Sequence, residues 1–262
     1  MTVKERKMGR ILAFANQKGG VGKSTSAINV ASGAALAGRR VLLVDCDPQG
    51  NTTSGVGINK KNLTASTYDV LISRTDAASA VIKTEFTNLW LMPSSISLAG
   101  AEFELVDTES REARLKKALA PLKDEYDLIV IDCPPSLGLI TVNALVASDG
   151  IVVPMLCEYF SLEGLTQLLM TVKEVKRRYN PQLELTGILI TMYNGRLNLS
   201  QEVAAELKRY YSGKLLATII PRSVKISEAP GFGQPIQYYD KHGKGTDAYN
   251  AAAAEIMKRA GV

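Results

Sequence analysis

The sequence predicts an α/β fold in which helices cover both faces of a mostly parallel, twisted sheet. Three observations lead to this expectation. Short apolar runs rich in β-branched residues recur along the 262-residue chain. Longer stretches with helical spacing separate most of them, as expected of crossover helices that bury a parallel sheet on both faces. A glycine-rich segment follows the first run, where the carboxyl end of a strand would open into a loop.

The elements follow from these runs in chain order. The expected strands are Ile11 to Ala15, Val41 to Val44, Leu89 to Met92, Leu128 to Ile131, Ile151 to Met155, Gly187 to Met192 and Leu216 to Ile220. The first expected helix, from Ser24 to Ala37, ends before Gly38, a residue type that often follows a helix C-terminus. A later helix is indicated by one apolar stripe at helical spacing, made of Leu162, Leu165, Leu168, Leu169, Val172 and Val175.

Two segments fall outside this pattern. Residues 1–10 are rich in lysine and arginine and are predicted to form a flexible basic arm. The region from Thr52 to Thr87 is more polar and shows only short helical patterns, at 68–72 and 77–82, so we expect a surface excursion there. Because no linker or repeat divides the rest, residues 11–262 are expected to form a single domain.

Composition limits the classes of protein that fit. The hydrophobic fraction of 46% allows a sizeable core, and the net charge of +5 is compatible with an anionic partner. No apolar run approaches the roughly 20 residues that a membrane-spanning helix needs. Cys46, Cys133 and Cys157 are widely spaced in or beside apolar runs, which indicates reduced core thiols and a cytoplasmic protein.

The segment NQKGGVGKST, residues 16–25, predicts a phosphate-binding loop between the first strand and the first helix. Its glycines let backbone N–H groups turn inward around an anion, and the helix N-terminus adds partial positive charge. Lys23 would then reach the β and γ phosphates of a nucleotide, and the Ser24 hydroxyl would bind Mg²⁺. The usual pattern is altered here, because Gln17 replaces its first glycine and Lys18 stands just inside the loop.

Carboxylates follow two of the expected strands. Asp45 and Asp47 would point the same way by strand alternation, so both could face the loop, position a water for attack on a γ phosphate and hold the hydration shell of Mg²⁺. The sequence leaves open the alternative that they cap a helix or form a turn around Pro48 and Gly50. Asp132 ends the run LIVID and indicates a Walker B element that holds Mg²⁺ through water.

Several motifs together resemble a known family. The loop KGGVGKS is similar to the deviant Walker A motif of the ParA/MinD superfamily of P-loop NTPases, which includes the nitrogenase iron protein. The blocks DCDPQGNTTSG, DCPPSLGLITVNAL, EYFSLEGLTQLL, ITMYNGR with LSQEV, and IPRSVKISEAPGFGQPI resemble more specifically the ParA/Soj ATPases that partition chromosomes and plasmids. The similarity extends from about Arg10 to Lys258, nearly the whole chain.

This resemblance implies roles for individual residues. Lys18 is similar to the signature lysine that crosses a dimer interface to the partner's ATP, Lys23 to the phosphate lysine and Ser24 to the Mg²⁺ ligand. Asp47 matches the acid that orients the attacking water. The remaining positions of the implied nucleotide site are Gly19, Gly20, Val21, Gly22 and Thr25 in the loop, with Asn194 and Pro221 bordering adenine.

The resemblance also implies a slow, partner-stimulated ATPase that acts as a switch. ATP would close two protomers face to face, this homodimer would bind double-stranded DNA without sequence preference, and hydrolysis would release the DNA. Arg196 and Arg222 match basic positions used for DNA, and Lys225 is a further candidate; ordinary solvated surface residues are the alternative. A ParB-like centromere-binding protein with a basic N-terminal peptide is the expected partner, and the expected location is the nucleoid.

Three rival functions remain to be compared. A MinD-like positioning ATPase would need an amphipathic C-terminal helix for the membrane, whereas the stretch from Ala248 to Arg259 is alanine-rich and is expected to pack on the body. A metallocluster carrier in the style of the iron protein would need paired or symmetric cysteines. A metabolic enzyme of the kinase or ligase type would need a motif for a second substrate, and we find none.

Overall fold

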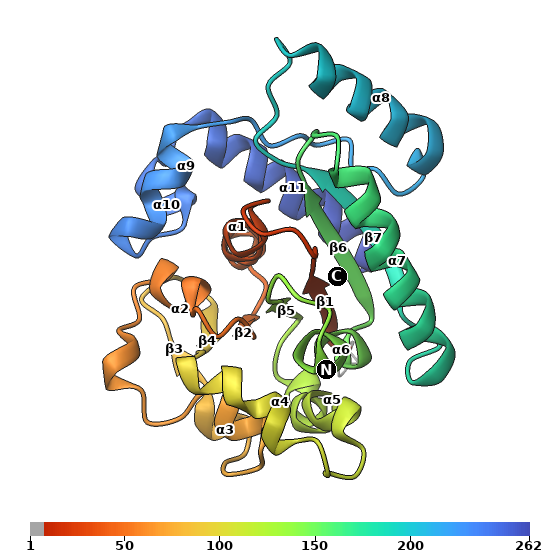
Figure 1. Cartoon of the computed structure of the whole chain (residues 1–262). Coiled ribbons are helices and arrows are strands. Elements are labelled where there is room, and N and C mark those ends of the chain that lie inside the picture. Colours follow the sequence, from red (N-terminus) through yellow and green to blue (C-terminus); the bar gives the residue numbers. More distant parts are fainter. Residues whose placement is uncertain (1–7) are drawn as a thin grey trace, which may run out of the picture.

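The computed structural model describes residues 8–262, with a seven-stranded sheet at its centre (Figure 1). The strands are β1 (Arg10–Phe14), β2 (Val41–Asp45), β3 (Ile82–Lys83), β4 (Leu89–Met92), β5 (Leu128–Asp132), β6 (Gly150–Met155) and β7 (Glu184–Ile190). Their order across the sheet is β3-β4-β2-β5-β1-β6-β7. All neighbouring strands are parallel except β3, which is antiparallel to β4. The mostly parallel sheet predicted from the sequence is therefore confirmed.

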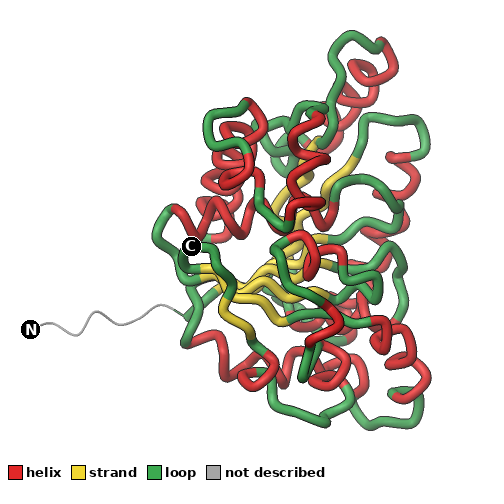
Figure 2. The backbone as a smooth tube through the Cα atoms, turned by 90° about the vertical axis from the view of Figure 1, so that its left-hand side faces the viewer, coloured by secondary structure: helices red, strands yellow, loops and turns green. Residues whose placement is uncertain are grey.

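Helices cover both faces of this sheet (Figure 2). One face carries α1 (Lys23–Leu36), α9 (Val224–Glu228), α10 (Ile236–Tyr239) and α11 (Lys244–Ala260), with α2 (Asn51–Gly55) beside α1. The other carries α3 (Thr67–Leu71), α4 (Ala101–Glu104), α5 (Arg114–Leu119), α6 (Leu139–Ala147), α7 (Ser161–Arg178) and α8 (Asn198–Tyr211). Short 3₁₀ turns are η1 (Lys60–Asn62), η2 (Ala78–Ala80), η3 (Ile96–Gly100), η4 (Arg111–Ala113), η5 (Ala120–Asp124) and η6 (Ala229–Phe232).

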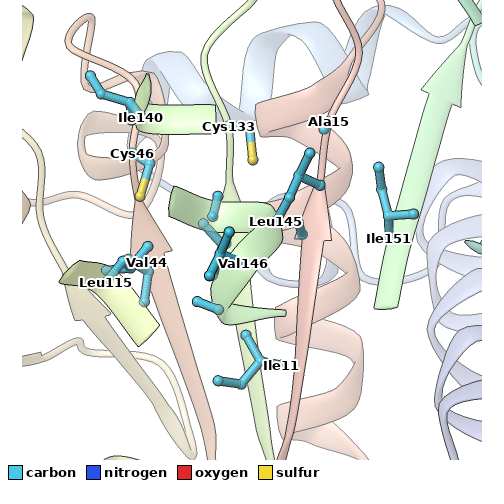
Figure 3. Packing of buried hydrophobic residues seen from close by; sticks show 14 of the residues in the cluster. Ile11, Ala15, Val44, Cys46, Leu115, Cys133, Ile140, Leu145, Val146 and Ile151 are labelled. Carbon is cyan, nitrogen blue, oxygen red and sulfur yellow. The ribbon is translucent and has the colours of Figure 1, made fainter. Parts of the chain in front are cut away.

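The strands are apolar on both faces because each face has its own core. In β1, Ile11 and Ala13 belong to the core under α3 to α8, whereas Leu12 and Phe14 belong to the core under α1 and α11. Figure 3 shows the first of these cores, where Leu145 and Val146 of α6 lie over the sheet. The three cysteines are free and buried, as expected from the sequence.

The expected strand from Leu216 to Ile220 is wrong. This segment runs beside β7 and makes only isolated bridges, since Leu216 N–H donates to Ile188 O and Ile220 N–H donates to Ile190 O, both over 2.9 Å. Between these two bonds, the N–H groups of Ala217 and Thr218 donate to the carboxylate of Glu255 on α11 instead. The side chain of Glu255 thus replaces the β-ladder, which a local apolar pattern could not indicate.

The surface excursion contains the short helix expected near residues 68–72, observed as α3. The second helical pattern, at 77–82, is a 3₁₀ turn that runs into β3. Most of the predicted basic arm lies outside the described residues, and its last member, Arg10, begins β1. At the other end of the chain α11 packs on α1, as expected for the alanine-rich stretch. Within residues 8–262, no helix is both long and apolar enough to cross a bilayer.

Candidate active site

The glycine-rich loop connects β1 to α1 at the carboxyl edge of the sheet. Gly20 and Gly22 have φ values of 73° and 79°, in the left-handed region that side chains disfavour. Gly22 is the N-cap of α1, so the loop leads directly into the positive end of a helix dipole. The loop borders a cavity of about 520 Å³ that is lined by Gly19, Gly20, Gly22, Lys23, Ser24 and Thr25, with Asp47, Gln49 and Asn51 opposite. This is a geometry suited to an anion.

Hydrogen bonds to neighbouring strands hold the loop in place. Asn16 Nδ2 donates to Pro154 O over 2.8 Å, and Asn16 Oδ1 accepts from Lys18 N–H over 3.0 Å. Thr191, just after β7, donates its hydroxyl to Val21 O over 2.8 Å. Val21 is accordingly buried and is not among the residues that line the cavity. Its role is therefore to fix the loop to the sheet.

Lys23 is the cation at the base of the loop. Its side chain is buried, and its Nζ donates to Lys18 O over 3.0 Å. Burial lowers the pKa of this ammonium, while the nearby carboxylates of Asp132 and Asp47 oppose the shift. A phosphate would supply the anionic partner that this partly desolvated cation needs.

The two aspartates after β2 have different environments. Asp45 is fully buried, and its Oδ2 accepts from both the N–H and the hydroxyl of Thr53 over 2.7 Å, while its Oδ1 accepts from Asp47 N–H. Asp47 lines the cavity, and its Oδ1 accepts from Gln49 N–H over 2.9 Å. The sequence left open whether these aspartates face the loop or stabilise a turn. For Asp45 the structure shows the second, because its carboxylate holds the turn into α2 and does not face the cavity.

Asp132 ends β5 and lies opposite Asp45 in the sheet register. Its Oδ2 accepts from the Thr52 hydroxyl over 2.7 Å, whereas its buried Oδ1 has no hydrogen-bond partner within residues 8–262. Burial, and then the nearby charge of Asp45, raises the pKa of Asp132, and the hydrogen bond from Thr52, with the nearby Ser24 hydroxyl, partly offsets the rise. A divalent cation would remove this penalty for the ionised form.

These groups fit Mg²⁺. An orphaned carboxylate oxygen and a hydroxyl are hard oxygen donors, and Mg²⁺ is usually held by one or two such groups, several waters and phosphate oxygens. Within the described residues, no group of three or more His, Cys, Asp or Glu side chains could hold a metal ion unaided. A cation at Ser24 and Asp132 would therefore depend on the oxygens of a bound nucleotide.

A second cavity of about 330 Å³ lies on the other side of the loop and shares Gly20, Gly22 and Thr25 with the first. Pro221, which the resemblance implies borders adenine, is one of its lining residues. Asn194 does not, because its Oδ1 turns back to accept from Arg196 N–H over 3.1 Å. Thr191, Met192 and Tyr249 also line this cavity and were missed from the sequence, since no local motif marks them.

Comparison with known proteins gives the family. A protein-family profile described as "AAA domain" matches residues 9–185. The sporulation initiation inhibitor protein Soj of Bacillus subtilis is 51% identical over 95% of this chain and 98% of its own length. The chain belongs to the ParA/Soj family of partitioning ATPases. A second relative, the chromosome-partitioning ATPase Soj of Treponema pallidum, is 51% identical over 97% of this chain and 99% of its own.

Solved structures agree on the fold of this ParA/Soj ATPase. A structure named cobyrinic acid a,c-diamide synthase from Mycobacterium smegmatis, with a bound ATP analogue and magnesium, has a TM-score of 0.83 and 38% identity. The match covers 94% of this chain and 93% of that one. The family and this fold identify the chain as a P-loop ATPase with the deviant Walker A loop.

Lys18, which the resemblance to the ParA/Soj family singles out, does not line either cavity of the site. Its ammonium forms an ion pair with Glu158, in the turn between β6 and α7. The position of Lys18 is thus compatible with a role toward a different molecule.

The basic residues predicted to bind DNA lie in two places on this ParA/Soj ATPase. Arg196 is exposed in the turn before α8. Arg222 is exposed just before α9 and also borders the second cavity. Lys225 on α9 pairs with Glu228 over 3.2 Å, and this hydrogen bond raises the pKa of the Lys225 ammonium. Of the three, Lys225 therefore has its charge balanced by a neighbouring residue of the same helix.

Proposed function

We propose that this protein is an ATP-switched DNA-partitioning ATPase. In its ATP-bound state two protomers form a face-to-face dimer that binds DNA without sequence preference, and hydrolysis, stimulated by a ParB-like partner, releases the DNA. The observation that carries the proposal is the cavity at the deviant Walker A loop, where Lys23, Ser24 and Asp47 converge beside Asp132.

The residues at this cavity have complementary tasks in ATP hydrolysis. Lys23 and the loop N–H groups would hold the β and γ phosphates. Ser24 and Asp132 would hold Mg²⁺, which when bound neutralises charge on the β and γ oxygens. Asp47, fixed at the cavity wall by its bond with Gln49 N–H, would orient the attacking water. The reaction then needs accurate positioning more than a strong base.

Lys18 would complete the site of the opposing protomer. Its ion pair with Glu158 is partly exposed, with 37% of the Lys18 side chain and 52% of the Glu158 side chain accessible, so the pair is easily exchanged for a phosphate. If Lys18 acts as an arginine finger does, its contribution to the rate is about 10³- to 10⁵-fold, or roughly 4 to 7 kcal/mol of barrier. Dimerisation would thus be required for fast turnover.

Arg196, Arg222 and Lys225 would bind phosphates of the DNA backbone. Such contacts give an affinity that falls with salt, with a slope of about −0.9 for each phosphate neutralised. A monomer offers half of the contacts that a dimer offers, so loss of the dimer would release DNA. Because Arg222 also borders the cavity next to the loop, it is the residue best placed to connect nucleotide state with DNA binding.

The rival membrane function finds no support in the C-terminal helix. Ala252, Ala253 and Ile256 of α11 are buried in the core that α11 shares with α1. An amphipathic helix that enters a membrane interface must present its apolar face outward. We therefore favour DNA as the surface on which the dimer assembles.

The test is binding to non-specific duplex DNA with ATP, ADP or no nucleotide, across a salt series. We expect tight, salt-sensitive binding with ATP only. Asp47→Ala should keep this binding because it blocks hydrolysis, and Arg222→Ala should lose it. The matched control is Arg39→Ala, which removes the same charge from an exposed position before β2. Binding that ignores the nucleotide, or that Arg39→Ala weakens as much as Arg222→Ala does, would refute the proposal.

A further inference from the structure

The first part of the surface excursion folds back onto the loop between β2 and α2. After α2 the chain reverses at once, because Gly57 N–H donates back to Ser54 O over 3.0 Å (Figure 1, orange segment). The 3₁₀ turn η1 follows, and Asn59 caps it by accepting from Lys61 N–H at its Oδ1 over 3.0 Å. This reversal brings Lys60, the first residue of η1, back over the start of α2.

Lys60 contacts the loop before α2 in two ways. Its Nζ donates to Gln49 O over 2.7 Å. Its aliphatic chain crosses Gly50, since a Cβ at Gly50 would stand 2.7 Å from Cδ of Lys60. Gly50 is buried, although Lys60 itself is exposed. Lys60 therefore covers the point at which the loop enters α2.

The same turn fixes Asp47. Gly50 N–H donates to Asp47 O over 2.9 Å, and Gln49 N–H donates to Asp47 Oδ1 over 2.9 Å. The peptide group between Gln49 and Gly50 is thus held at its N–H by Asp47 and at its carbonyl by Lys60. Gln49 and Asp47 line the phosphate cavity, whereas Lys60 is not among the lining residues. Lys60 can therefore act on this site through the turn or through its charge.

The hydrogen bond from Lys60 is a strong one for an exposed position. A bond from an ammonium to a carbonyl is charge-assisted and is roughly twice as strong as a bond between neutral groups. Within residues 8–262 Lys60 forms no ion pair that would compete for its ammonium. Without this bond, water would be the partner of the Gln49 carbonyl, and the turn would gain freedom. A small displacement of a group that positions a reactant lowers the rate of reaction.

We propose that Lys60 is a positioning residue for ATP hydrolysis. Its ammonium holds the turn from Asp47 to Gly50 in the form that keeps the Asp47 carboxylate at the cavity wall. This inference rests on the proposed function, in which Asp47 orients the attacking water. The phosphates are held by the glycine-rich loop and Lys23, so ATP binding does not depend on Lys60. Loss of Lys60 therefore lowers kcat and leaves KM for ATP unchanged.

Steady-state phosphate release over a range of ATP concentrations tests this inference. Lys60→Ala should lower kcat about three- to tenfold and change KM for ATP less than about twofold. Lys60→Met keeps a long side chain over Gly50 but has no donor, and its kcat should fall by the same factor. Lys60→Arg keeps a charged donor and should recover at least about half of the original kcat. Melting temperatures should stay within about 2 °C, because the side chain is exposed.

Lys61→Ala is the matched control. Lys61 is exposed in the same 3₁₀ turn and forms no ion pair with any described residue, so the change removes the same charge from a neighbouring position. It should leave kcat and KM unchanged. If Lys61→Ala lowers kcat as much as Lys60→Ala does, the effect comes from charge near the site and the inference is wrong. It is equally wrong if Lys60→Met keeps the full kcat, or if Lys60→Ala raises KM and leaves kcat unchanged.

A double-mutant cycle tests whether Lys60 acts through Asp47. On the residual hydrolysis of Asp47→Asn, adding Lys60→Ala should have less than about a twofold effect. A further fall of about three- to tenfold would show that Lys60 acts elsewhere and would overturn the inference. The two proposals fail separately. Normal hydrolysis by Asp47→Asn would remove the proposed role of Asp47, whereas impaired hydrolysis by Asp47→Asn with an unchanged kcat for Lys60→Ala would remove this inference alone.

Discussion

Asp45 and Asp47 lie two residues apart, and replacing each by asparagine should have opposite effects. In Asp45→Asn one of the two carboxylate oxygens becomes an NH₂, which would face either the Thr53 N–H and hydroxyl or the Asp47 N–H, all of which now donate to the carboxylate. In either orientation of the amide, one buried backbone N–H loses its acceptor. Losing hydrogen bonds to a buried charged group and leaving a donor unsatisfied costs about 2 to 4 kcal/mol of unfolding free energy.

The expected shift in melting temperature follows from the size of the protein. An unfolding entropy of about 2.1 cal/mol/K per residue gives roughly 0.55 kcal/mol/K for this chain. A loss of about 2 to 4 kcal/mol therefore lowers the melting temperature by about 4 to 7 °C. Asp47→Asn keeps an oxygen for Gln49 N–H, so its unfolding free energy should change by less than about 1 kcal/mol. Its ATP hydrolysis should fall at least about 100-fold, because the group that we propose orients the water loses its charge.

Urea unfolding and steady-state phosphate release on the two variants would check this contrast. The slope of unfolding free energy against urea should stay the same, so that a change in midpoint reports stability. The reasoning would be refuted if Asp47→Asn destabilised the protein as much as Asp45→Asn. It would equally fail if Asp45→Asn left the melting temperature unchanged.

Other predictions follow from the same structure. Burial and the charge of Asp45 raise the pKa of Asp132 from 3.8 to about 7, so the folded state binds this proton more tightly than the unfolded state does. The unfolding free energy without nucleotide should therefore fall as the pH rises from about 4 to about 7. Asp132→Asn should flatten this dependence in urea titrations at several pH values. Thr191→Val removes the hydroxyl that holds Val21 O and should weaken nucleotide binding several-fold by calorimetry, with melting temperature lowered by only a few degrees. Gly33→Val should destabilise the protein by about 1 to 3 kcal/mol, because a Cβ at Gly33 would stand 2.8 Å from Cβ of Ala253; intact stability would show that α1 and α11 can separate.

Much of the fold follows from short-range patterns in the sequence. Apolar, β-branched runs predict β1 and β5 because nearly every residue of a strand buried on both faces must be apolar. The loop from Gly19 to Ser24 is recognisable because phosphate binding needs glycines and a lysine at fixed spacing. Asp132 stands out for a similar reason, as an acid that ends a buried strand. These signals are local, so they can be read without knowing the tertiary structure.

Interactions between segments that are distant in the sequence could be found only from the tertiary structure. The N–H groups of Ala217 and Thr218 donate hydrogen bonds to the carboxylate of Glu255, far along the chain. They therefore do not pair with β7, and the predicted last strand does not form. The bonds from Thr53 decide that Asp45 is structural while Asp47 faces the cavity. The sequence alone determined which chemical groups are present and on which elements they lie. Packing of residues that are remote in sequence decided which of those groups are free to act, because each hydrogen bond formed within the fold removes a partner from the site.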